Sequence, residues 1–214
     1  MSLIAKTIQF VKEQLKNAEG GHDWFHIERV YKNALLIAEA EDCDLEVVTL
    51  AALLHDIADS KFHNGNETIG PKIARAYLES NRVLPATVDH VIAIIENISF
   101  KGGNFERTFD SKELYIVQDA DRLDAIGAIG IARTFNYGGF KNRALYDPEI
   151  QPNLSQTKEE YKKSEGPTLN HFYEKLLLLK DKMNTETGIK MAKKRHDFML
   201  HFLAQFYAEW EGKV

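Results

Sequence analysis

Apolar residues recur every three or four positions along almost the whole chain, a spacing that is typical of amphipathic α-helices. No stretch of useful length alternates between apolar and polar residues as a half-buried β-strand would, and the sequence has no internal repeat. The spacing predicts helices over residues 3–20, 24–41, 45–58, 67–80, from 85, from 111, 169–183 and 187–210. The sequence therefore predicts an all-α fold.

One of these segments, Leu45 to Ala58, is apolar nearly all round its helical circumference, which marks a helix buried at the centre of a bundle. It contains the dipeptide His55-Asp56 near its end. Buried ionisable groups are costly unless they are paired or bind a metal. Adjacent helical residues project about 100° apart, so these two side chains can hold one cation from two sides. A hydrogen-bonded His–Asp pair is the alternative interpretation of the dipeptide alone.

Further candidate ligands precede and follow this segment. His26 lies on the preceding predicted helix, and VQDADRLDAIG places Asp119, Asp121 and Asp124 in a helix that is otherwise apolar on its inner face. Three carboxylates in such a segment are costly without a cation or basic partners. Two histidines and two aspartates form a mixed ligand set that suits Mn²⁺, Fe²⁺, Zn²⁺ or Mg²⁺ and leaves positions open for water and substrate.

Two other His-Asp dipeptides have different surroundings. In His22-Asp23, Asp23 is well placed to act as a helix N-cap, and Ser111 is the expected N-cap of the helix with the three aspartates. His196-Asp197 follows a basic run on the amphipathic last helix, where a solvated polar face is the expected role.

The apolar periodicity stops between Gly138 and Pro167, where three of the five prolines lie. Loops of this length are usually functional or mobile. We therefore expect a helical core over residues 1–137. Over residues 138–214 we expect a long irregular segment and two C-terminal helices that pack on the core as one structural unit. The aromatic residues of the last helix are assigned to the core, with a homodimer face as the alternative; they are Phe198, Phe202, Phe206 and Trp210.

Three segments together resemble the HD superfamily of metal-dependent phosphohydrolases: HxxRV from His26, ALLHDIAD over 52–59 and DADRLDA over 119–125. The last is similar to the ADRL segment of the stringent-response nucleotide hydrolases, which makes Asp121 the liganding carboxylate. The resemblance covers about residues 21–135. It implies an HD-domain helical bundle, here with a C-terminal helical extension. The metal ligands that it implies are His26, His55, Asp56 and Asp121.

At a finer level, the segments GHDWFH and NHFYEKLL look like those of a group of small bacterial HD proteins. For that group, nucleotide pyrophosphohydrolase activity is the implied function. The expected reaction is therefore cleavage of a nucleoside triphosphate to the monophosphate and pyrophosphate. The alternatives are a 5′-nucleotidase or cyclic-nucleotide phosphodiesterase on the same scaffold, and a metal-dependent nucleotide sensor without turnover. The sensor is disfavoured because no ligand position is lost.

The sequence departs from the two-metal members of the superfamily, which often carry a His-His pair on the helix after the HD helix. Here the comparable position reads Glu96-Asn97, and His90 is the nearby histidine. We therefore expect one divalent ion, with Mn²⁺ or Mg²⁺ favoured over Fe²⁺, Zn²⁺, Co²⁺ or Ni²⁺.

Side chains near the expected ligands are candidates for catalysis and substrate binding. Asp59, one turn after His55, is a candidate proton acceptor, and Lys61 is a candidate to stabilise charge on the transferred phosphoryl group. Their alternative roles are a helix-end carboxylate and a surface ion pair. The candidates for contacts with the substrate phosphates are Lys61, Arg122, His22 and His63.

The bulk composition limits the partners of the chain. Its net charge of −5 gives no general attraction to nucleic acid or anionic membranes, so an anionic substrate needs a local positive centre such as a bound metal. The single cysteine, Cys43, excludes an intrachain disulfide and is typical of a reducing cytosol. No signal-peptide pattern and no apolar run of about 18–20 residues appear. We expect a cytoplasmic protein that binds a small phosphorylated nucleotide, without a stable nucleic-acid complex.

Overall fold

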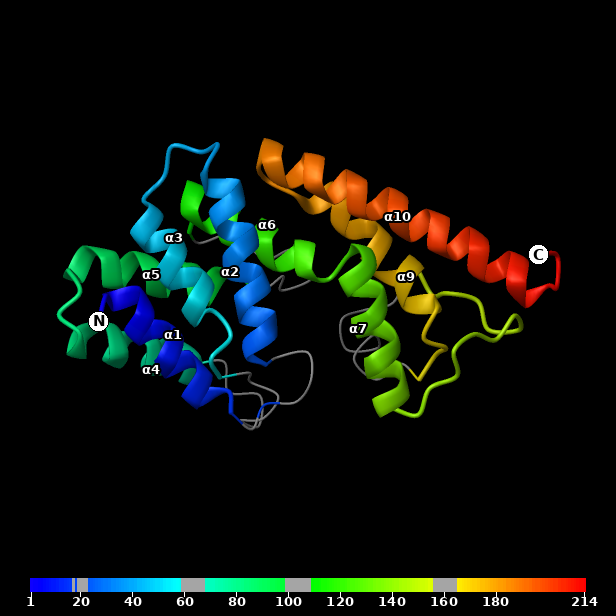
Figure 1. The fold of residues 1–214 in the computed structure, drawn as a ribbon, viewed down its shortest axis with the longest axis horizontal. Helices are drawn as coiled ribbons and strands as arrows, with labels where there is room; N and C mark the ends of the chain where they lie inside the picture. The colour runs from blue at the N-terminus through cyan, green and yellow to red at the C-terminus, as the bar shows by residue number, and fades with distance from the viewer. Residues whose placement is uncertain (17, 19–22, 59–67, 99–108, 156–164) are drawn as a thin grey trace. The chain divides into compact units, whose positions relative to one another are not determined.

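The structure is a computed structural model of residues 1–214, and it describes all of them except residues 17, 19–22, 59–67, 99–108 and 156–164. Within the described residues every regular element is a helix, which confirms the all-α prediction (Figure 1). The elements are α1 (Leu3–Gln14), α2 (Trp24–Ala38), α3 (Leu45–Leu54), α4 (Ile69–Ser80), α5 (Pro85–Asn97), α6 (Lys112–Asp124), α7 (Gly127–Phe140), α9 (Asn170–Glu174), the 3₁₀ helix η2 (Leu176–Lys182) and α10 (Glu186–Trp210).

The chain divides into two compact units, Met1–Asp121 and Arg122–Val214. The boundary falls inside α6, so this helix begins in the N-terminal unit and ends in the C-terminal unit. Packing of the C-terminal helices on the core as one structural unit stays a prediction.

The N-terminal unit is built around α3, on which α1, α2 and α5 pack (Figure 1). Every residue of α3 from Val47 to Leu54 is buried, as its apolar circumference predicted. The helix ends at Leu54, earlier than the predicted Ala58, and His55 is its C-cap. His55 therefore directly follows the most apolar helix of the chain, with no exposed residue between it and the buried residues of α3.

Side-chain caps set the starts of the two other helices that matter for the site. The Asp23 carboxylate accepts a hydrogen bond from the backbone N–H of His26 at 3.0 Å, and the Ser111 hydroxyl accepts one from the N–H of Leu114 at 3.0 Å. Both N-cap predictions are therefore confirmed. Each cap satisfies a backbone N–H that has no partner within its own helix.

The C-terminal unit contains α7, α9, η2 and α10, with α10 packed on α7 and η2. The predicted helix over 169–183 is wrong in one respect, because it is broken into α9 and η2. At Lys175 the backbone has φ −143° and ψ −57°, outside the α-helical region, so the α-helical hydrogen bonds stop there.

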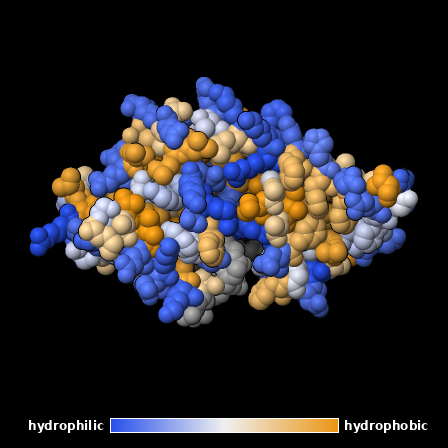
Figure 2. Space-filling model, viewed as in Figure 1, coloured by the Kyte–Doolittle hydropathy of each residue, from blue (hydrophilic) through white to orange (hydrophobic). Residues whose placement is uncertain are grey.

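The core assignment of the last helix holds for only part of its aromatic set. Phe202 is half-buried and stacks on Phe172, with ring centroids 5.8 Å apart. Phe198 and Trp210 are 51% and 52% exposed, so their assignment to the core is wrong for the single chain. Figure 2 shows hydrophobic residues at the surface of both units.

Within the described residues, no helix combines the length and apolar character that crossing a bilayer requires.

Shortening a side chain of α3 should test its central position. Leu50 is fully buried, so Leu50→Ala leaves a cavity and should lower the free energy of unfolding by about 2–5 kcal/mol. Leu45 begins the same helix but is 53% exposed, and Leu45→Ala should cost less than about 1 kcal/mol. Urea unfolding followed by circular dichroism compares the two. Equal losses would contradict a core centred on α3.

A second prediction concerns pH and the C-terminal unit. Burial, followed by the charges of Lys175 and Arg143, lowers the pKa of His171 to about 3. The unfolded chain, with a histidine pKa near 6.5, therefore binds one more proton than the folded chain between about pH 6.5 and 3. Stability should fall as the pH falls, by at most about 2 kcal/mol between pH 6.5 and 5 from this residue. His171→Gln should remove that part of the slope in urea titrations, and an unchanged slope would contradict the assignment.

Candidate metal centre

The imidazole of His55 has one nitrogen held by the backbone and one that is not. Its Nδ1 lies 2.9 Å from the carbonyl oxygen of Ala52, and because a carbonyl accepts, Nδ1 carries the proton. Burial lowers the pKa of His55, which keeps the ring neutral. The Nε2 atom is buried and has no hydrogen-bond partner among the described residues. Leaving a buried lone pair without a partner costs about 1–3 kcal/mol, and binding of a metal ion to Nε2 would remove this cost.

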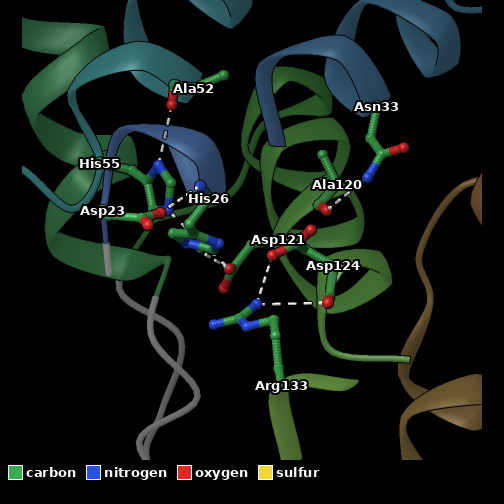
Figure 3. Close-up of polar contacts among 9 residues, drawn as sticks. All are labelled: Asp23, His26, Asn33, Ala52, His55, Ala120, Asp121, Asp124 and Arg133. Carbon is green, nitrogen blue, oxygen red and sulfur yellow. Dashed lines mark hydrogen bonds and ion pairs between the residues drawn. The ribbon is translucent and has the colours of Figure 1, made fainter. Parts of the chain in front are cut away.

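His26 and Asp121 lie against this lone pair (Figure 3). The Oδ1 atom of Asp121 is 3.6 Å from Nε2 of His26 and 3.9 Å from Nε2 of His55. The two imidazole rings meet edge to face, with centroids 5.3 Å apart. Ligand atoms about 2.1 Å from one ion lie roughly 3–4 Å apart, so these three atoms fit a shared cation.

Asp56 forms a second possible ligand group with the same two histidines. His26, His55 and Asp56 each offer a ligand atom, and these atoms all lie within 4.8 Å of one another. Across the part of the chain that the structure describes, this is the one group of three or more His, Cys, Asp or Glu side chains that could hold an ion. The structure thus brings together His26, His55, Asp56 and Asp121, although 66 residues separate His55 from Asp121.

The three aspartates of α6 have different surroundings. Asp121 has a side chain that is 38% exposed and lies against both histidines. Asp124 is buried and forms an ion pair with Arg133. Asp119 is completely buried. Geometry therefore favours Asp121 as the carboxylate that faces the histidines.

The other predicted site residues are Arg122, whose contacts the structure describes, and four that lie outside the described residues. Arg122 is half-buried, and its guanidinium donates a hydrogen bond to the backbone carbonyl of Lys182. His90 contacts Ser111 and Glu113 and is not a member of the His26, His55 and Asp56 group; binding of one ion stays a prediction. The residues outside the described part are His22, Asp59, Lys61 and His63, and their roles stay predictions.

In the remaining His-Asp dipeptide, Asp197 lies at the surface as predicted, whereas Nδ1 of His196 is buried and burial lowers its pKa. The carboxylate of Asp197 accepts a hydrogen bond from Nζ of Lys193 at 2.7 Å, and its side chain is 46% exposed. It therefore serves as a surface counterpart to Asp56 in mutational tests.

Contacts that hold the ligand helices were missed by sequence reasoning. Asn33, on α2, donates from Nδ2 to the carbonyl oxygen of Ala120 at 3.4 Å and so ties α2 to the residue before Asp121. Asn33 lies seven residues after His26, two helical turns along the same face, which was the available signal. At the end of α6, Arg133 and Arg195 contact the backbone of Asp124 and Leu123.

Comparison with known proteins gives matches along nearly the whole chain. The HD domain family matches residues 24–126. The uncharacterized protein YpgQ of Bacillus subtilis is 39% identical over 206 residues, which cover 95% of this chain and 91% of that protein. The crystal structure of an HD-superfamily hydrolase from Bacillus thuringiensis is 46% identical, with a TM-score of 0.78 and coverage of 97% and 96% of the two chains. The structure of Bacillus subtilis YpgQ in complex with ADP is 36% identical, with a TM-score of 0.75 and coverage of 96% and 97%.

Removal of the Asp56 carboxylate should show whether Asp56 is a metal ligand or a structural partner of His55. Asp56→Ala should abolish retention of Mn²⁺ in isothermal titration calorimetry, because a ligand atom is lost, while the far-UV circular dichroism stays helical. Asp197→Ala, in the surface His-Asp dipeptide, should bind Mn²⁺ as the wild type does. Full metal binding by Asp56→Ala would exclude Asp56 from the ligand set.

Proposed function

This chain belongs to the HD superfamily of metal-dependent phosphohydrolases, and we propose that it cleaves nucleoside triphosphates to the monophosphate and pyrophosphate. The observation that carries the proposal is the buried Nε2 of His55, which has Oδ1 of Asp121 3.9 Å away and belongs to a group of possible ligands with His26 and Asp56. This donor set suits a divalent cation, because it combines two imidazole nitrogens with two carboxylates.

The residues of the chain prepare this site before any cation binds. The Ala52 carbonyl fixes the tautomer of His55, so that its lone pair points toward Asp121. The Asp23 cap fixes the first turn of α2, which carries His26. A divalent ion held by these groups would lower the pKa of a water molecule and polarise a phosphoryl oxygen. Asp59 and Lys61 are the proposed proton acceptor and phosphate-stabilising cation.

Water is the nucleophile that this chain favours. Burial, followed by the charge of Glu113 and other nearby carboxylates, raises the pKa of the Cys43 thiol and disfavours the reactive thiolate. The sequence has no motif for a serine nucleophile either. Hydrolysis without a covalent intermediate on Cys43 is therefore the reaction that we propose.

The nucleotide part of the proposal is supported by a relative. The Bacillus subtilis YpgQ structure is a complex with ADP, and that protein is 36% identical to this chain over nearly its full length. We propose on this basis that the substrate is a nucleotide, with Arg122, Lys61, His22 and His63 as phosphate contacts. Release of pyrophosphate is proposed from the resemblance to the small bacterial HD group.

A substrate panel tests these steps separately. Purified protein should release pyrophosphate from ribo- or deoxynucleoside triphosphates with Mn²⁺ or Mg²⁺, measured by ³¹P NMR of the products. Asp56→Ala should lower the rate by at least about 100-fold, and Asp197→Ala should leave it unchanged.

Other outcomes of the panel discriminate between the alternatives. Orthophosphate from monophosphates alone would replace the substrate assignment with a 5′-nucleotidase and keep the metal chemistry. Binding of nucleotide and metal without any product would indicate a sensor.

A further inference from the structure

The last turn of α6 carries Asp121 and needs partners for its backbone carbonyls. The last carbonyl groups of an α-helix receive no hydrogen bond from an N–H group of the same helix. Here the N–H of Ala125 bonds to the carbonyl of Arg122 at 3.1 Å, and the N–H of Ile126 bonds to that of Leu123 at 3.3 Å. The chain then turns sharply into α7, which begins at Gly127. The direction of Asp121 depends on how firmly this turn is held.

Two arginines hold the end of the helix. Arg195, on α10, lies 72 residues after Leu123 and donates a hydrogen bond to its carbonyl. Arg133, on α7, donates to the carbonyl of Asp124 at 3.3 Å and pairs with its buried carboxylate (Figure 3). Cationic side chains at a helix C-terminus satisfy these carbonyls and favour the helix dipole.

The turn between α6 and α7 leaves space for the side chain of Arg195. Gly127 has φ +77°, a conformation that favours glycine. A Cβ atom there would lie 3.0 Å from Cβ and Cγ of Arg195 and 3.3 Å from its Cδ. The glycine therefore leaves room for the arginine stem, whose guanidinium reaches the end of α6.

We propose that Arg195, supported by Arg133, is a positioning residue that holds the last turn of α6 so that Asp121 faces the two histidines. This inference rests on the proposed metal centre. Arg195 acts through the backbone of Leu123, to whose carbonyl it donates a hydrogen bond. Within the N-terminal unit, Asn33 donates a hydrogen bond from α2 to the Ala120 carbonyl, next to Asp121.

Metal titration of the full chain tests the inference. Arg195→Met should weaken Mn²⁺ binding by about 10-fold or more in isothermal titration calorimetry, at a temperature where circular dichroism shows the variant folded. Arg195→Lys keeps the charge and most of the stem, so it should recover part of the affinity. Lys193→Met, on the same helix and 69% exposed, should bind Mn²⁺ as the wild type does.

A glycine pair gives the second variant should Arg195→Met fail to fold. Gly127→Ala keeps Arg195 but obstructs its stem, so it should weaken Mn²⁺ binding in the same way. Gly139→Ala serves as the control on α7, because a Cβ atom there meets nothing within 4 Å.

The outcomes separate this inference from the proposed function. Wild-type Mn²⁺ affinity in folded Arg195→Met, or in folded Gly127→Ala, would reduce Arg195 to a structural role and leave the metal centre intact. A wild-type protein that binds no Mn²⁺, Mg²⁺ or other divalent ion would instead overturn the proposed function, and the positioning role with it.

Discussion

The unpaired Nε2 of His55 is the constraint on which the rest of the structure depends. Helix α3 is buried from Val47 to Leu54, so its end places the His55 imidazole where its Nε2 is buried. The Ala52 carbonyl accepts a hydrogen bond from Nδ1, so the lone pair of the ring is on Nε2. A buried acceptor without a donor costs about 1–3 kcal/mol, a cost that a bound cation would offset. The packing of α3 is thus itself an argument for a bound cation.

The other candidate ligands reach this lone pair from helix ends. His26 lies in the first turn of α2, Asp56 follows the C-cap of α3, and Asp121 lies in the last turn of α6. Helix bodies in the core are fixed by close packing, whereas helix ends carry backbone groups that side chains such as Asp23 can hold. Because capping acts at single atoms, it can set the direction of a ligand without altering the core. This division explains why caps recur beside the site.

The sequence predicted those features that depend on local pattern. Helical spacing located most elements, the apolar circumference of α3 predicted its burial, and Asp23 was recognised as a cap from its position. The break at Lys175 was missed, because apolar spacing is similar in an α-helix and in a short helix followed by a 3₁₀ turn. The contact of Arg195 with Leu123 was missed as well, because a hydrogen bond across 72 residues leaves no local signal.

The choice among the aspartates of α6 shows where sequence reasoning needed help. Composition made all three costly and could not rank them, so the resemblance to ADRL segments selected Asp121. The structure supplies the physical distinction: Asp124 has Arg133 as its counterion, whereas Asp121 lies beside two imidazoles, one of which is kept neutral by burial.

Charge balance at the candidate centre constrains how a polyphosphate can be recognised. The two carboxylates among the four groups carry a formal charge of about −2, which one divalent ion offsets. The loaded centre is then close to neutral, and the chain as a whole carries −5. Attraction for a triphosphate over a monophosphate must therefore come from cations outside the ligand set, such as the proposed Lys61 and Arg122. In the proposed function, the ligand set supplies the hydrolytic chemistry, and Lys61 and Arg122 are the proposed determinants of which phosphate chain is cleaved.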